Sequence, residues 1–135
     1  MTSKPTTLRF GIAGYGNAQR QLVLAMRDHP HITAAAAADD AQAPLDKFSA
    51  EFGGATFRSV EQMCKSPDLD AIYVTGANEL HAEHVVMAAD HKKQIIVEKP
   101  IALSLAECDA MLAAVNRSGV RLLAGHTHAF DVPNK

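Results

Sequence analysis

Short apolar segments alternate with amphipathic segments along most of the chain, and this alternation is what most restricts its fold. The apolar segments have the length of buried strands, while the segments between them repeat apolar residues at helical spacing. Strands are expected at residues 8–13, 31–38, 69–74, 94–98 and 120–124, with helices at residues 18–28, 44–52 and 79–89. Short connections between strand and helix favour an α/β fold: one domain built on a doubly wound parallel sheet with helices on both faces.

Residues 31–38 carry two conflicting signals. The run of alanines that begins at Ala34 favours a helix by intrinsic propensity. The segment is short, however, and it is enclosed by Pro30 on one side and Asp39-Asp40 on the other. It also lies where a second buried strand is needed, so we predict a strand.

Two capping boxes mark the starts of further helices. Ser59 with Gln62 begins a short helix through residue 64, and Ser104 with Glu107 begins a longer one that Gly119 ends. The longer helix is expected to turn four side chains inward: Leu105, Cys108, Leu112 and Val115.

Composition excludes several classes of protein. The 13 basic and 15 acidic side chains nearly cancel, and no block of Lys or Arg stands out, so a nucleic-acid partner is not expected. No apolar run is long enough to cross a bilayer, and residues 1–9 lack the apolar stretch of a secretory signal. Cys64 and Cys108 are expected to be buried, reduced thiols. These features predict a cytoplasmic protein without a membrane association.

A glycine turn joins the first strand to the first helix. In Gly14-Tyr15-Gly16, Gly14 would allow the tight turn, and Gly16 would let the backbone approach a pyrophosphate. Amides of the helix start, at Asn17 and Ala18, would then bind the anion. The third glycine of such turns is replaced by Gln19. Turn glycines that bind no ligand are the alternative.

Asp39 follows the second expected strand at the distance from the glycine turn that a ribose-binding carboxylate has. Such a carboxylate accepts hydrogen bonds from ribose hydroxyls and repels a 2′-phosphate, so we predict NAD over NADP. The competing interpretation makes Asp39 the N-cap of the next helix, a role for which Asp40 is better placed.

The stretch Val97-Glu98-Lys99-Pro100 ends an apolar run with a charged pair and a proline. At the carboxyl end of a parallel strand it would place an ammonium in the crevice where α/β proteins bind ligands. Near a nicotinamide, Lys99 could bond a substrate hydroxyl or relay its proton if burial lowered its pKa. Pro100 could fix the turn through a cis peptide. A solvated lysine paired with Glu98 is the alternative.

The histidines do not have the spacing of a recognised metal site, and we expect no metal. His81 and His128 are expected to face the crevice, with His128 and Pro100 on the substrate side. We expect three further histidines at the surface: His29, His31 and His91.

Taken together, these residues resemble the glucose–fructose oxidoreductase/inositol dehydrogenase/rhizopine catabolism (Gfo/Idh/MocA) family. The resemblance rests on the segments 9–16, Asn78-Glu79-Leu80-His81 and 97–100, together with Asp39 and the ending 125–131. That ending is similar, more loosely, to members acting on 4,5-dihydroxyphthalate-type dihydrodiols. The chain has Gly76-Ala77 where the family often has threonine-proline.

The resemblance implies a Rossmann domain that binds NAD, with Lys99 at the active site beside the nicotinamide and Asn78, His81 and Glu98 bordering the cofactor. It implies hydride transfer between this cofactor and a hydroxyl carbon of a small polyol, sugar or dihydrodiol. Residues 1–7 are then a flexible terminus, residues 8–130 the dinucleotide-binding domain, and residues 131–135 the start of a connection to a second domain.

Two further expectations follow from the second domain that family members have. Without it, the chain would bind cofactor with little turnover and would self-associate through an exposed sheet edge. A non-catalytic nucleotide-binding module, such as a redox sensor or an assembly subunit, is the alternative function.

Overall fold

The computed structural model describes residues 7–125, apart from the side chains of residues 17–19. Six strands form one parallel sheet in the order β3-β2-β1-β4-β5-β6. They are β1 (Leu8–Ala13), β2 (Ile32–Ala38), β3 (Ala55–Phe57), β4 (Ala71–Val74), β5 (Gln94–Glu98) and β6 (Leu122–Gly125). The strand order reverses between β1 and β4, so the crevice for a ligand opens at the carboxyl ends of these two strands.

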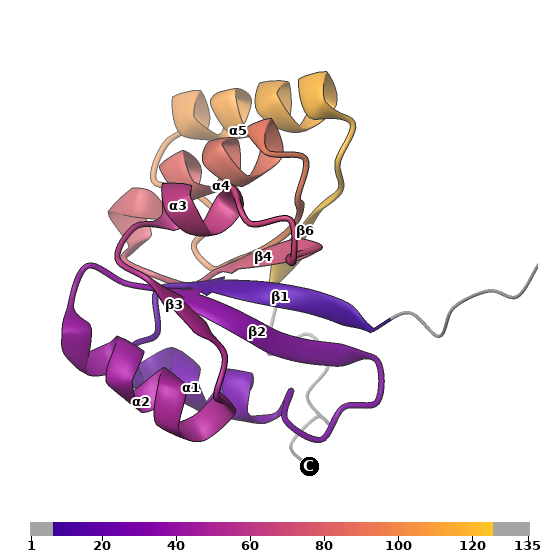
Figure 1. Cartoon of the computed structure of the whole chain (residues 1–135). Coiled ribbons are helices and arrows are strands. Elements are labelled where there is room, and N and C mark those ends of the chain that lie inside the picture. Colours follow the sequence, from indigo (N-terminus) through magenta and orange to yellow (C-terminus); the bar gives the residue numbers. More distant parts are fainter. Residues whose placement is uncertain (1–6, 126–135) are drawn as a thin grey trace, which may run out of the picture.

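Helices cover both faces of the sheet (Figure 1). On one face lie α1 (Asn17–Leu24) and α2 (Gln42–Phe52), and on the other lie α3 (Val60–Cys64), α4 (His81–Asp90) and α5 (Leu105–Ser118). A single 3-10 turn, η1 (Asn78–Leu80), leads into α4. The arrangement confirms the predicted doubly wound fold. Among the described residues, no helix is long and apolar enough to cross a membrane.

The alanine-rich segment is a strand, as predicted, and it lies between β1 and β3 in the sheet. Its register with β1 shifts once, since Phe10 pairs with Ala34 and Gly11 with Ala36. Ala34 and Ala37 consequently pack with the core on the α1–α2 face, while Ala36 and Ala38 pack with the core on the other face. Tertiary burial therefore overrides the helix propensity of these alanines.

Three expectations about the elements need correction. The first helix ends at Leu24 instead of residue 28, because the chain continues in turns such as Ala25 N to Leu22 O and Met26 N to Val23 O. Strand β3 was not predicted, since a segment of only three residues with exposed side chains shows no periodicity.

The inward face of α5 was also predicted wrongly in part. Leu105 and Leu112 are 83% and 54% exposed, whereas Met111 and Ala114 are buried. The buried stripe is rotated around the helix toward Met111 and away from the two leucines. Cys108 and Val115 are half-buried, as this rotation requires.

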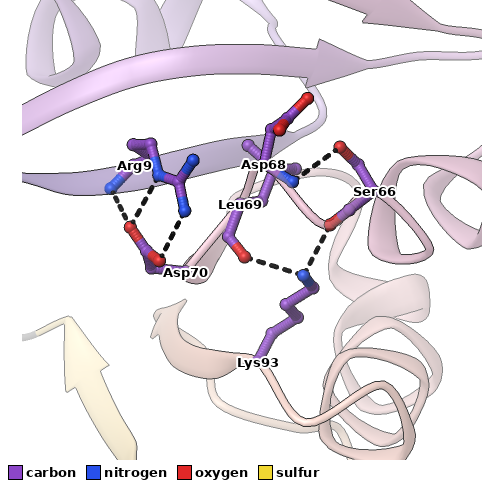
Figure 2. A network of polar contacts seen from close by, with 6 residues as sticks. All are labelled: Arg9, Ser66, Asp68, Leu69, Asp70 and Lys93. Atoms are coloured by element: carbon purple, nitrogen blue, oxygen red, sulfur yellow. Dashed lines mark hydrogen bonds and ion pairs between the residues drawn. The ribbon is translucent and has the colours of Figure 1, made fainter.

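A polar network holds the amino ends of three central strands together, at the edge of the sheet opposite the crevice (Figure 2). The backbone amide and the guanidinium of Arg9, on β1, both bond the carboxylate of Asp70, which precedes β4. Lys93, before β5, is 8% exposed and donates to the carbonyls of Ser66 and Leu69 at 2.6 and 2.7 Å. The Arg9 guanidinium also holds the pKa of Asp70 below its usual value.

Candidate functional site

The glycine turn after β1 packs directly against the loop after β4. Gly14 has φ +95°, and a Cβ at this position would lie 2.5 Å from the Cα of Gly76. The hydroxyl of Thr75 donates to the Gly14 carbonyl at 2.9 Å, which fastens the two loops to each other. Gly14 therefore makes the tight turn that the sequence predicted. Thr75 and Gly76 were not predicted as its partners, although a glycine two residues after a strand is a signal for such a close approach.

The start of α1 is open at this turn. Gly16 is the N-cap residue, exposed and without a side-chain cap. Asn17 opens the first helical turn, followed by Ala18, so their backbone amides point out of the helix end. An anion placed there would meet unbonded amides and the positive end of the helix.

Asp39 lies immediately after β2 and is tied to the glycine turn. Its Oδ2 accepts from the amide of Tyr15 at 3.2 Å, and its Oδ1 accepts from the amide of Ala41 at 3.0 Å. Helix α2 begins with Ala41 as its N-cap and no side-chain cap, so neither Asp39 nor Asp40 caps it. The carboxylate instead fixes the loop at the rim of the crevice.

The side chain of Tyr15 points away from the crevice into the core. Its ring is 2% exposed and packs edge-on against Phe48 at 5.4 Å, and its hydroxyl donates to Glu51 at 3.0 Å. Burial, together with this bond to Glu51, raises the pKa of Tyr15 to about 12. Tyr15 thus reaches the site through its backbone amide.

A cleft of about 460 Å³ runs from the glycine turn along the rim of the sheet. Its lining includes Gly14, Gly76 and Asp39, and an apolar wall of Val60, Leu80 and Met87. A lining that combines a carboxylate with apolar side chains suits a nucleoside, with its ribose at the carboxylate and its base against the apolar wall.

Two further side chains on this cleft had no signal in the sequence. Arg58 follows β3 and donates to the carbonyl of Asp40 at 2.5 Å and to Oε1 of Gln42 at 3.4 Å, so it braces the loop that carries Asp39. His84, 9% exposed, has a buried Nδ1 without a hydrogen-bond partner in the described part of the chain. Burial lowers the pKa of His84, so its neutral form is favoured.

Lys99 follows β5 at the same carboxyl edge of the sheet. The carboxylate of Glu98 accepts from the hydroxyl of Tyr73 at 2.7 Å and from the amide of Lys99 at 3.3 Å. The Lys99–Pro100 peptide bond is cis, as the sequence predicted. The side chain of Lys99 is exposed, so the burial that a proton relay requires is not supplied by residues 7–125.

Glu98 also explains the glycine at the end of β6. A Cβ on Gly125 would lie 2.9 Å from Oε1 of Glu98, so a side chain there would displace the carboxylate. Burial and the bond to Glu98 together raise the pKa of Tyr73, which keeps its proton on the hydroxyl that donates to Glu98.

The histidines agree with the expectation only in part, since His29 and His31 lie at the surface as predicted while His81 and His91 do not lie where they were expected. His81 is 1% exposed and bonds two backbone carbonyls, Pro100 at 2.7 Å through Nδ1 and Gly76 at 3.0 Å through Nε2, so it lies beneath the crevice. His29 and His31 are exposed, while His91 is half-buried, and His126 and His128 lie outside the described residues. Within residues 7–125 no three His, Cys, Asp or Glu side chains gather as metal ligands would.

A second hollow, of about 650 Å³, lies among α3, α4 and α5. Its floor is apolar, with Ala82, Val86 and Met87, and it contains neither the glycine turn nor Lys99. Gly14, Asp39 and Lys99, which the sequence predicted for the cofactor and substrate site, lie instead at the carboxyl edge of the sheet. Asn78, exposed at the start of η1, also lies at this edge.

Comparison with known proteins agrees with this geometry. A model of the oxidoreductase family with an NAD-binding Rossmann fold matches residues 8–126. The 1-carboxy-3-chloro-3,4-dihydroxycyclohexa-1,5-diene dehydrogenase of Comamonas testosteroni is 33% identical over 127 residues, which cover 93% of this chain and 32% of the relative. The 2,7-anhydro-N-acetylneuraminate hydratase of Escherichia coli K12 is 30% identical over 123 residues, covering 91% of this chain and 32% of that protein.

Among solved structures, scyllo-inositol dehydrogenase from Lactobacillus casei with bound NAD(H) and scyllo-inositol superposes with a TM-score of 0.86 at 22% identity. The match covers 93% of this chain and 38% of that one. At this identity the likeness shows the fold. The chain spans about a third of the length of the curated relatives it matches, 32% of each.

Proposed function

The chain belongs to the Gfo/Idh/MocA oxidoreductase family as an NAD-binding Rossmann domain, and from this premise we propose the reaction and the residues that carry it. The protein transfers hydride between the nicotinamide and a hydroxyl carbon of a small polyol, sugar or dihydrodiol. The names of its relatives support this class, since they include a dehydrogenase of a dihydroxylated ring and a sugar-acid hydratase.

One observation carries the assignment of the cofactor site. The glycine turn, Asp39 and the apolar wall line one cleft, and Lys99 follows a neighbouring strand at the same sheet edge. In this proposal the pyrophosphate lies on the amides of Asn17 and Ala18, and the ribose hydroxyls reach Asp39. The loop of Asn78, above His81, and the Glu98 carboxylate border the nicotinamide half.

We assign the proton of the substrate hydroxyl to Lys99, with Pro100 and His128 on the substrate side. Hydride transfer itself is the chemistry of the nicotinamide when it is bound. The part of the protein is to orient the hydroxyl and to hold or accept its proton at Nζ of Lys99. Because this side chain is exposed among residues 7–125, the proposal requires that cofactor, substrate or further protein cover it during the reaction.

NAD is proposed over NADP, because Asp39 and Asp40 stand together at the rim and a 2′-phosphate would face both carboxylates. Arg58 at the same rim offsets part of this charge. The discrimination is therefore expected to be a preference for NADH, not an exclusion of NADPH.

A fluorescence titration of the purified chain with NADH, and separately with NADPH, tests the proposal. Saturable binding that is clearly tighter for NADH is expected, with little or no turnover of polyols by the 135 residues alone. Absence of saturable binding for both nucleotides would refute the cofactor site. Robust dehydrogenase activity of the 135-residue chain would refute the expectation of little or no turnover.

We also propose that the chain associates with itself through β6 and acts in the cytoplasm. This strand pairs only with β5 among the described strands, and Leu123 on it is 63% exposed. An unpaired strand edge with an apolar side chain favours association. Sedimentation velocity at increasing concentration should show dimers that Leu123→Lys removes, and a clean monomer at high concentration would contradict this.

A further inference from the structure

His81 is one of four buried polar side chains in the described chain, and it is the least expected of them. It opens α4, is 1% exposed, and lies between the loop after β4 and the turn after β5. Both of its ring nitrogens face backbone carbonyl oxygens: Nδ1 faces Pro100 at 2.7 Å, and Nε2 faces Gly76 at 3.0 Å. One side chain therefore spans two loops of the site.

The two partners restrict where the ring carries its protons. A carbonyl oxygen only accepts, so each of these bonds requires a hydrogen on the ring nitrogen that makes it. A neutral ring can make one of the two bonds, and a doubly protonated ring can make both. The contact at Nδ1 is the shorter of the two, which favours the bond to Pro100 in a neutral ring.

The two carbonyls lie next to residues of the proposed site. Pro100 directly follows Lys99, so fixing its carbonyl fixes the plane of the Pro100–Ile101 peptide, next to the peptide that joins Lys99 to Pro100. Gly76 lies against Gly14 in the glycine turn. The amide of Lys99 in this segment also donates to the carboxylate of Glu98, and this bond is longer, at 3.3 Å.

We propose that His81 is a positioning residue for Lys99. Its Nδ1–H donates to the Pro100 carbonyl and holds the Lys99–Pro100 turn in place, and a ring that also carries a hydrogen on Nε2 would link this turn to the Gly76 loop. The contacts stand on the geometry alone. The consequence for the reaction rests on the proposed function, in which Lys99 holds the proton of the substrate.

Ring protonation can be read directly. The ¹⁵N chemical shifts of the His81 ring in the 135-residue chain report which nitrogens carry hydrogen. A protonated Nδ1 is expected, with or without a second proton on Nε2. A neutral ring protonated only on Nε2 would overturn the proposal, since the Pro100 carbonyl would then have no donor.

Three variants separate the contributions of the two ring nitrogens, Nδ1 and Nε2. His81→Asn places an amide donor near the position of Nδ1, His81→Gln places one near Nε2, and His81→Phe keeps a ring without donors. His91→Phe is the matched control at the C-cap of the same helix, because its Nδ1 also lies 2.8 Å from a carbonyl, that of Met87, away from the site.

Hydrogen exchange of the Lys99 and Ile101 amides is the readout, measured with the global stability of each variant. In His81→Phe and His81→Gln, exchange should become about tenfold faster, as the loss of one buried hydrogen bond implies. His81→Asn and His91→Phe should stay close to the wild type. A role in general stability would not distinguish Asn from Gln, so equal effects of these two variants would overturn the proposal.

A parallel NADH titration separates this inference from the proposed function. If the wild-type chain fails to bind NADH, the cofactor site is refuted, while the exchange data still test the positioning role of His81. If NADH binds and the exchange rates of the variants match the wild type, the cofactor site stands and the positioning role of His81 is refuted.

Discussion

A side chain on Gly14 would collide with Gly76, since its Cβ would lie 2.5 Å from the Cα of that residue. Two loops that follow different strands, β1 and β4, are thus in backbone contact at the point where the strand order reverses. The contact brings the helix start at Gly16 and the loop that carries Asn78 to the same crevice. The restriction is weaker on the other side of the contact, since a Cβ on Gly76 would lie 3.3 Å from the carbonyl oxygen of Ala13 and 3.7 Å from the Cα of Gly14.

Gly14→Ala should therefore destabilise the fold and abolish NADH binding. The variant combines a strained φ of +95° with a backbone collision, and we expect a loss of about 2–4 kcal/mol in the free energy of unfolding. Urea denaturation and an NADH titration measure the two effects.

Gly119→Ala is the control, because Gly119 has φ +74° but nothing within 4 Å of its added Cβ. It should cost only the conformational strain, about 1 kcal/mol, and leave NADH binding intact. Equal losses in the two variants would show that the contact with Gly76 is unimportant.

Asp39→Asn should weaken NADH binding about tenfold and reduce the preference over NADPH. The amide loses the negative charge that accepts strongly from ribose hydroxyls and repels a 2′-phosphate, an effect of about 1.5 kcal/mol. Parallel titrations with both nucleotides give the ratio of the dissociation constants.

Asp40→Asn serves as the control, since this exposed neighbour has the same charge. It should change the NADH affinity little and the NADPH affinity slightly, through charge alone. If Asp40→Asn changed the NADH affinity as much as Asp39→Asn, direct recognition by Asp39 would be excluded.

Strands that are long or buried were predicted from the sequence. Elements whose formation or orientation depends on contacts with a neighbouring segment were predicted less well. Strand β2 was recognised despite its alanines because Pro30 and Asp39-Asp40 limit its length. Strand β3 exists because Ala36, Ala37 and Ala38 offer it a partner, which nothing within the segment reveals. On α5, the predicted buried face contained Leu105 and Leu112, but the structure buries Met111 and exposes both leucines.

At the candidate site, local sequence predicted features of the backbone, whereas contacts between distant segments were missed. The positive φ of Gly14 and the position of Lys99 after β5 follow from local sequence. The bracing by Arg58, the orphaned nitrogen of His84 and the two carbonyls around His81 depend on loops that meet only in the fold. Neither Arg58 nor His84 has a periodicity or a motif that would have indicated its role, and the segment that contains His81 does not indicate its two carbonyl partners.

Stability should decrease as the pH falls below about 6.5, in part because of His84. Burial is the main cause that lowers the pKa of His84 from 6.5, with His81 adding to it and Glu83 opposing it. Between the two pKa values the unfolded chain binds a proton that the folded chain does not, so the free energy of unfolding falls with falling pH. The slope for one group is at most about 1.4 kcal/mol per pH unit.

Urea denaturation at several pH values between 5 and 8 measures this slope. His84→Phe should flatten it, whereas His29→Phe, a change at an exposed histidine, should leave it unchanged. The same slope in His84→Phe and in the wild type would assign the pH dependence to other groups.

Lys93 should contribute more to stability than any exposed lysine, although it lies at the edge of the sheet opposite the crevice (Figure 2). Its ammonium donates to the carbonyls of Ser66 and Leu69 while only 8% of the residue is exposed. Lys93→Met keeps an unbranched side chain but leaves the two carbonyls without this donor, which should lower the free energy of unfolding by about 1–3 kcal/mol.

Lys65→Met is the control for this last change. The ion pair of Lys65 with Glu61 is exposed and 3.6 Å long, so its loss should alter the free energy of unfolding by about 0.5 kcal/mol or less. NADH affinity should be the same in both variants, because neither residue lines the cleft. A weaker affinity in Lys93→Met, at a pH and temperature where the variant is fully folded, would mean that the amino ends of the strands influence the crevice across the sheet.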